Sequence, residues 1–287
     1  MASPSDLVVS GAAHAWVLPA SRALWRQRQD VVGAVEKLRA FLLGRKIRLA
    51  CTGMPGVGKT VLLDHITGRA SQTGYKPPGV SHAVEKRDLS LEGRRVAFSI
   101  VPGQDSPQRH DALDAAFDPK ALPDGVIHVV SNGYVTLRSE EARRLEAVAW
   151  PSLDAFLAVR RQQEVADLDL VCTRLNAVLR RNHKPSWLLV ALTKVDLFQE
   201  DLAQAEAWYG PDADSPFADR LRRLQGKIGS DRFQWSVAPV CAWPEDFDFG
   251  DFTVVSGFKS PERDHYLTTF LEVLDGLSQR EIREASP

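Results

Sequence analysis

The sequence predicts an α/β protein whose sheet is doubly wound and mostly parallel, and two observations predict this class. First, several of the short β-like runs are continuously apolar, as expected for parallel strands that helices cover on both faces. Second, segments with apolar residues at helical spacing lie between most of these runs. Alternating strands and helices build a parallel sheet flanked by helices.

Six strands are expected in order along the chain. The candidates are β-like runs at 46–53, 83–91, 95–101, 125–131, 187–193 and 235–242. Before them, apolar residues at helical spacing over 22–43 indicate an amphipathic helix. The expected organisation is therefore a helical N-terminal extension over 1–44, followed by one large domain over 45–287.

Two segments leave alternatives open. Residues 139–182 are long for a single connection, and Pro151 should end one helix before one or two more begin. Unbroken, the helix after Pro151 would be about 45 Å long at 1.5 Å per residue. This helical insert is either an elaborated covering helix or an arm that docks a partner. The segment 243–252 mixes acidic and aromatic residues. It is either a recognition loop or a set of aromatic residues folded under an acidic rim.

Composition excludes several classes of partner. The 287 residues carry a formal net charge of -1, so no global field favours nucleic acid. No apolar run approaches the roughly 20 residues that span a bilayer, and Ala2 and the cysteine-free tail offer no lipidation motif. The three cysteines are expected to be reduced residues of the core. We therefore expect a cytoplasmic protein with no nucleic-acid partner and no direct membrane anchor.

The segment "GMPGVGKT" matches the phosphate-binding pattern G-x-x-x-x-G-K-[ST] and lies between a predicted strand and a predicted helix. Its glycines let consecutive backbone N–H groups converge on phosphate oxygens at the positive end of the helix. The lysine would reach the β- and γ-phosphates, and the threonine hydroxyl would coordinate Mg²⁺. The expected nucleotide contacts are Gly53, Met54, Pro55, Gly56, Val57, Gly58, Lys59 and Thr60.

The segment "TKVD" follows a late apolar strand and selects the base. The Asp196 carboxylate would accept hydrogen bonds from guanine N1–H and from the 2-amino group, while the stem of Lys194 lies over the base. Adenine offers neither donor there, and a site built around such bonds rejects a base that lacks them. This motif therefore favours GTP over ATP.

The order of "GMPGVGKT", "VPGQ" and "TKVD" resembles the Ras-like small GTPases over residues 46–280. The segment "VPGQ" is similar to the MglA-type bacterial branch, which also commonly lacks the switch aspartate. The resemblance implies a Ras-like G domain that binds GTP or GDP with Mg²⁺. Thr193 stands where asparagine is commoner, as in Rac-like members. "VCA" stands where the family has Ser-Ala-Lys, so the backbone of Ala242 would bind guanine O6, although Cys241 and Trp243 depart from that pattern.

The resemblance also assigns roles in the switch regions. The N–H of Gly103 would contact the γ-phosphate, and Gln104 would orient the attacking water. Ser81 would join Thr60 as a metal ligand, with Thr73 as the rival for that role. Ile100 stands where an aspartate usually holds Mg²⁺ through water, so the metal site is weakened but keeps its direct ligands.

Gln104 and Lys59 are the expected catalytic residues. No arginine can be assigned to the charge that develops on the γ-phosphate, and Arg109 near the switch is expected to be a solvated helix residue. We therefore expect a slow GTP/GDP switch that signals to a protein effector, with an activating protein as a further partner. The alternatives are a nucleotide-stabilised scaffold that does not hydrolyse GTP, favoured by Ile100, and an ATPase of another P-loop class.

Overall fold

The computed structural model describes residues 47–71, 73–77, 85–91, 94–103, 107–137 and 139–284. The expected helix at 22–43 lies outside these residues, so the N-terminal extension stays a prediction. The regular elements are β1 (Arg48–Thr52), α2 (Lys59–Ile66), β2 (Glu85–Leu91), β3 (Arg94–Ile100), α3 (Pro107–Ala116), β4 (Gly125–Val130), α4 (Glu140–Ala149), α5 (Leu153–Leu179), β5 (Trp187–Leu192), α6 (Leu202–Tyr209), α7 (Pro216–Ile228), β6 (Gln234–Pro239), β7 (Phe247–Phe249), β8 (Phe252–Val254) and α8 (Ser260–Glu284).

The main sheet has six strands in the order β2-β3-β1-β4-β5-β6. Only the β2–β3 pair is antiparallel, and the other four pairs run parallel. The six expected strands are thus confirmed, as is the doubly wound α/β class. From β1 the strand order proceeds outward in both directions, and ligands of such sheets bind at this reversal, beyond the carboxyl ends of the strands. The segment "GMPGVGKT" begins at that point.

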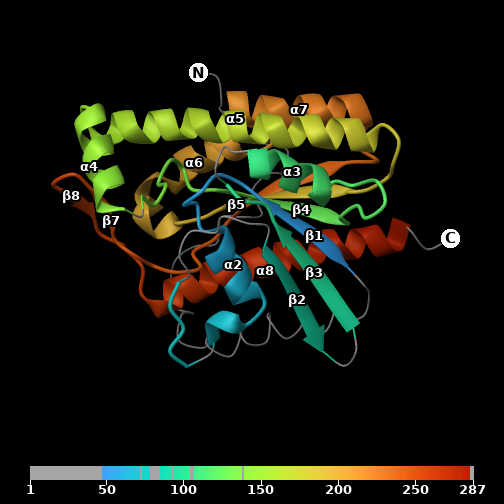
Figure 1. Cartoon of the computed structure of the whole chain (residues 1–287), viewed down its shortest axis with the longest axis horizontal. Coiled ribbons are helices and arrows are strands. Elements are labelled where there is room, and N and C mark those ends of the chain that lie inside the picture. The colour runs from blue at the N-terminus through green and yellow to red at the C-terminus, as the bar shows by residue number, and fades with distance from the viewer. Residues whose placement is uncertain are drawn as a thin grey trace, which may run out of the picture.

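Helices cover both faces of the sheet. In Figure 1, α3, α5, α6 and α7 lie above the sheet, and α2 and α8 lie below it. Alternation along β4 divides its side chains between the two layers. Val126 and Val130 pack in the core that contains Phe156 of α5, while Ile127 packs in the core that contains Phe270 of α8.

The segment 139–182 folds into two helices separated at Pro151, as predicted. Helix α5 is unbroken for 27 residues, about 40 Å at 1.5 Å per residue. Its buried side chains pack against the sheet, so α5 fits the covering-helix interpretation. Helix α4 differs, because none of its residues is buried and Leu145 and Val148 are 60% and 84% exposed.

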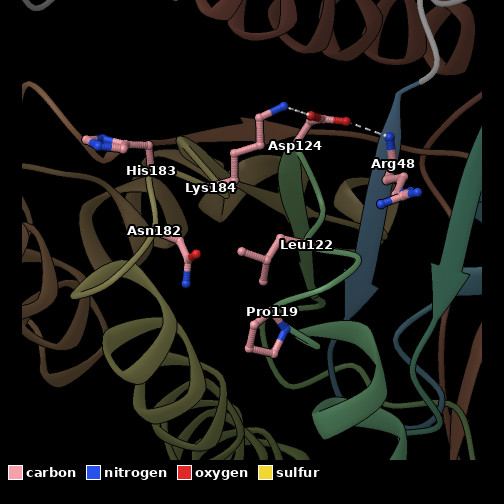
Figure 2. A pocket seen from close by; sticks show the side chains of 7 residues that line it. All are labelled: Arg48, Pro119, Leu122, Asp124, Asn182, His183 and Lys184. Atoms are coloured by element: carbon pink, nitrogen blue, oxygen red, sulfur yellow. Dashed lines mark hydrogen bonds and ion pairs between the residues drawn. The ribbon is translucent and has the colours of Figure 1, made fainter.

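The amino ends of the strands form a polar hollow at the edge of the sheet away from "GMPGVGKT". Figure 2 shows this cavity of about 450 Å³, lined by Arg48, Pro119, Leu122, Asp124, Asn182, His183 and Lys184. The Asp124 carboxylate accepts a hydrogen bond from the backbone N–H of Arg48 over 2.7 Å and pairs with Lys184. Lys184, between α5 and β5, thus ties the segment before β5 to the segment before β4.

Two further sequence predictions concern the core and the membrane. Cys51, Cys172 and Cys241 are buried and form no disulfide, as expected of core residues. Burial raises the pKa of the Cys51 thiol to about 12, so it stays protonated. None of the helices in the described part of the chain is both long and apolar enough to cross a bilayer.

Candidate nucleotide site

The loop from Gly53 to Thr60 connects β1 to α2 in a shape that requires glycine. Gly53, Gly56 and Gly58 have φ angles of 130°, 78° and 95°, which residues with a side chain rarely adopt. A Cβ on Gly53 would lie 2.3 Å from the carbonyl oxygen of Val129, and one on Gly56 would lie 2.6 Å from that of Thr136. The loop therefore packs its backbone tightly against the sheet and delivers the chain to the N-terminus of α2, where N–H groups are available to an anion.

Lys59 is the first residue of α2, and its side chain turns back into the loop. Its ammonium donates hydrogen bonds to the carbonyl oxygens of Gly53, over 2.8 Å, and Met54, over 2.7 Å. The residue is only 8% exposed. The ammonium is therefore buried against the loop, and its contact with the β- and γ-phosphates stays a prediction.

Gly103 lies against the same loop. A Cβ at this position would be 2.2 Å from the Pro55 nitrogen and 2.7 Å from the Lys59 ammonium nitrogen, so glycine permits a close approach of the two backbones. Ile100, three residues earlier, is buried in the core that also contains Leu62 of α2. Gln104 and Ser81 lie outside the described residues, and their roles stay predictions.

The motif "TKVD" is attached to the phosphate loop at its other end. The Thr193 hydroxyl, directly after β5, lies 2.7 Å from the Val57 carbonyl oxygen and 2.9 Å from that of Val130. The two carbonyls share its single proton. The Lys194 ammonium donates to the Tyr134 carbonyl and to the Thr136 hydroxyl, each over 2.6 Å. The base motif and the phosphate loop are therefore held as one unit.

Asp196 is 3% exposed, and its carboxylate is held by donors from distant segments. The Cys241 thiol donates to one oxygen over 3.3 Å, and the Ser256 hydroxyl donates to the other over 2.7 Å. The backbone N–H of Glu245 makes a longer contact of 3.4 Å. A carboxylate has about four lone-pair positions, so acceptor capacity remains for a base. Ser256, 60 residues away along the chain, carried no signal in the sequence.

Two adjoining cavities join these groups. The larger, about 330 Å³, is lined by Gly56, Gly58, Lys194, Ala242 and Trp243, together with Val57, Val61, Pro77, Thr136, Leu137, Arg143, Thr193 and Glu245. The smaller, about 110 Å³, shares Lys194 and Trp243 with it and is also lined by Asp196. Residues of the phosphate loop, the base motif and Ala242 therefore line these two neighbouring cavities, which together are called the hollow below. Leu137 and Arg143 were missed from the sequence because the connection after β4 has no recognisable motif.

Comparison with known proteins identifies the family of this chain. The model of the family described as 50S ribosome-binding GTPase matches residues 48–192, just over half of the chain. The chain belongs to this family of GTPases. Among solved structures, the G domain of the T. maritima FeoB iron transporter is similar over 69% of this chain and 89% of its own, with 19% identity and a TM-score of 0.33. No curated protein matches the sequence. The P-loop GTPase resemblance is confirmed, and the MglA-type branch stays a prediction.

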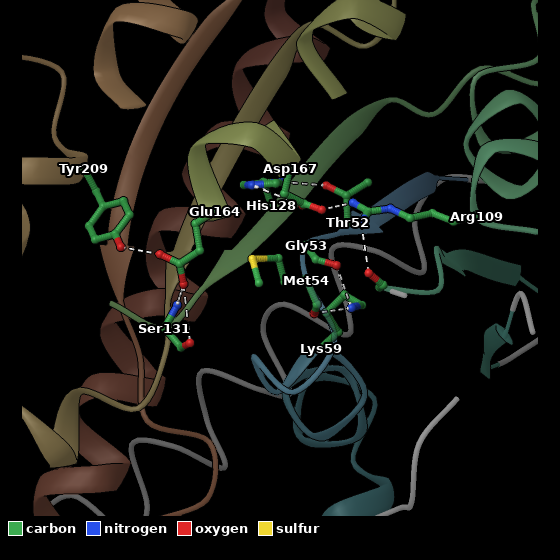
Figure 3. A network of polar contacts seen from close by, with 11 residues as sticks. Thr52, Gly53, Met54, Lys59, Arg109, His128, Ser131, Glu164, Asp167 and Tyr209 are labelled. Atoms are coloured by element: carbon green, nitrogen blue, oxygen red, sulfur yellow. Dashed lines mark hydrogen bonds and ion pairs between the residues drawn. The ribbon is translucent and has the colours of Figure 1, made fainter. Parts of the chain in front are cut away.

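One sequence expectation about this GTPase is wrong. Arg109 is not solvated but 4% exposed, because its guanidinium pairs with the Asp167 carboxylate of α5 and donates to the Gly103 carbonyl over 2.9 Å. Figure 3 shows this network beside Lys59. Asp167 is 58 residues from Arg109, and helical spacing alone did not indicate that α3 and α5 would bury an ion pair.

The network continues through His128 of β4. Its Nδ1 is 2.9 Å from the Thr52 hydroxyl, at the end of β1, and its Nε2 is 3.9 Å from Asp167. Burial lowers the pKa of His128 to about 3, and the charges of Arg109 and Lys59 act in the same direction. The imidazole is therefore neutral near pH 7, and Arg109 supplies the positive charge opposite Asp167.

A second buried acid fixes the connection after β4. The Glu164 carboxylate of α5 accepts hydrogen bonds from the Ser131 N–H, over 2.8 Å, and from the Tyr209 hydroxyl. Burial raises the pKa of Glu164. Tyr134 and Thr136 of this connection accept hydrogen bonds from Lys194. By holding the connection, Glu164 therefore also stabilises the position of Lys194.

The segment 243–252 leads into the β7–β8 hairpin, which spans 247–254 beside the base motif. Phe247 and Phe249 are buried against Phe156, while Asp248 and Asp251 are exposed. This arrangement fits aromatics folded under an acidic rim, except that Phe252 is 66% exposed.

Proposed function

We propose that this GTPase binds GTP and GDP in the hollow between the phosphate loop and "TKVD" and acts as a slow switch read by a protein partner. One observation carries the proposal: two cavities adjoin, with Lys194 and Trp243 in the lining of both. Asp196 lines the smaller one, and Gly56, Gly58 and Ala242 line the larger one. We infer that the base would lie next to Asp196, beyond the phosphate loop. Cys241 donates to Asp196 from the position of the family's serine, and Trp243 replaces the lysine at the rim.

A Mg²⁺ ion fits the oxygen donors of this site. Thr60 lies in the first turn of α2, so its hydroxyl and the nucleotide's own phosphates would supply hard oxygen ligands. Within the described part of the chain, no group of three or more His, Cys, Asp or Glu residues could hold a metal alone. The metal is therefore expected to bind with the nucleotide and to neutralise phosphate charge there.

The arrangement of arginines supports slow unaided hydrolysis. Arg109 is engaged by Asp167 and Gly103, and Arg143 lines the cavity that also contains Gly56 and Gly58. We assign neither to the charge that develops on a γ-phosphate, so a partner would complete the site. A scaffold that binds nucleotide without hydrolysis is the second candidate, favoured by the apolar, buried Ile100.

Single-turnover kinetics on the purified protein distinguish these candidates. We expect hydrolysis at roughly 10⁻⁴–10⁻² s⁻¹, the intrinsic range of such enzymes without a partner. Gln104→Leu should slow it further with little change in GTP affinity, because the glutamine acts mainly in the transition state. Turnover above about 1 s⁻¹ without a partner would contradict the slow switch. Absence of any turnover, with GTP still bound, would favour the scaffold.

A further inference from the structure

Arg109 connects the switch segment to the long helix α5. Its guanidinium donates to the Gly103 carbonyl and pairs with the Asp167 carboxylate, and both bonds are charge-assisted. Arg109 and Asp167 are each 4% exposed, so water and salt screen the pair only weakly. A buried ion pair is weak evidence for stability by itself. The role of this pair is therefore inferred from its contact with the Gly103 carbonyl.

Gly103 lies directly against the phosphate loop. Its backbone approaches the phosphate loop so closely that a Cβ would lie 2.7 Å from the Lys59 ammonium nitrogen. Glycine has the greatest backbone freedom of all residues and no side chain to anchor it. The bond from Arg109 therefore adds a charged hydrogen bond to the backbone of a residue that abuts Lys59.

Asp167 lies within α5, which packs against the sheet. Its second carboxylate oxygen is 3.9 Å from Nε2 of the neutral His128, which is beyond hydrogen-bond distance. His128 bonds Thr52, which directly precedes Gly53 of the phosphate loop. Arg109 thus links the Gly103 backbone to α5 through Asp167.

We propose that Arg109, paired with Asp167, is a positioning residue for γ-phosphate recognition that holds the Gly103 backbone beside Lys59. The inference rests on the proposed function, because it assigns a role within the same nucleotide site. GDP lacks the terminal phosphate that Gly103 would contact. The pair should therefore favour GTP over GDP and leave the base and the α- and β-phosphates unaffected.

The test compares the affinities of Arg109→Gln for GDP and for a non-hydrolysable GTP analogue, by titration calorimetry. Binding of the analogue should weaken about tenfold or more, the scale of a lost hydrogen bond to a charged group. Binding of GDP should change by less than about threefold, since its contacts are intact. Asp167→Asn should shift the ratio in the same direction, because Arg109 then loses its charged partner.

Arg174→Gln is the matched control. Arg174 of α5 also pairs with an aspartate of α3, Asp114, over 2.6 Å, but this pair is at the surface and does not contact Gly103. The control should leave the ratio of the two affinities unchanged.

Removing one charge from the buried pair can also prevent folding. The double variant Arg109→Gln/Asp167→Asn leaves no unpaired charge. If a single variant does not fold, the ratio of the two affinities is measured on this double variant instead. A folded variant that keeps the wild-type ratio, or that loses both ligands equally, would overturn the inference. A wild-type protein that binds neither nucleotide would overturn the proposed function itself.

Discussion

Replacing Asp196 with asparagine is expected to weaken GTP binding by at least about 100-fold and to improve binding of xanthosine triphosphate. The carboxylate presents acceptors to guanine N1–H and to the 2-amino group, whereas an amide places its own N–H donors against one of them. Xanthine carries a carbonyl in place of that amino group and accepts from the amide. Competition against a fluorescent guanine nucleotide measures both changes.

Ser256→Ala is the matched control for this substitution. It removes the hydroxyl that donates to Asp196 over 2.7 Å, yet it keeps both carboxylate oxygens as acceptors. We expect it to retain the preference for GTP over xanthosine triphosphate. Unchanged GTP affinity in a folded Asp196→Asn variant would show that Asp196 does not bind the base.

Lys59→Ala is expected to lose most of the affinity for GTP, by about 100-fold or more, while the protein stays folded. The lysine is the sole charged side chain of "GMPGVGKT", and each charge-assisted hydrogen bond to phosphate is worth roughly 1.5–3 kcal/mol. Its removal also frees the carbonyls of Gly53 and Met54, which the ammonium now engages. Equilibrium titration with GTP measures the affinity, and circular dichroism checks the fold.

Lys227→Ala provides the comparison for that variant. Lys227 is an exposed residue near the end of α7, away from the phosphate loop, and its loss should not alter GTP binding. If a folded Lys59→Ala protein bound GTP as tightly as this control, the segment "GMPGVGKT" would not be the phosphate site.

The features that the sequence predicted are those encoded by adjacent residues. The phosphate loop and "TKVD" are each contiguous, and their spacing to a strand or helix is visible without a structure. Strands such as β5 were found because a short, continuously apolar run is typical of a buried parallel strand. Pro151 likewise marked a helix end, because proline disfavours a helical residue before it.

The features that the sequence missed depend on tertiary contacts between distant residues. Arg109 reads as a surface arginine on a polar helix, and only the packing of α3 on α5 brings it to Asp167. Ser256 follows the β7–β8 hairpin, and its meeting with Asp196 depends on how that hairpin folds back. Such pairings are set by loop geometry and by burial, which no local pattern encodes.

Competition between GTP and ATP for the wild-type protein is the most direct test of guanine selection by Asp196. With a fluorescent guanine nucleotide bound, GTP should displace it at least about 100-fold more effectively than ATP, the scale expected when a base lacks the required donors. Equal displacement by ATP would contradict guanine selection and favour an ATPase of another P-loop class.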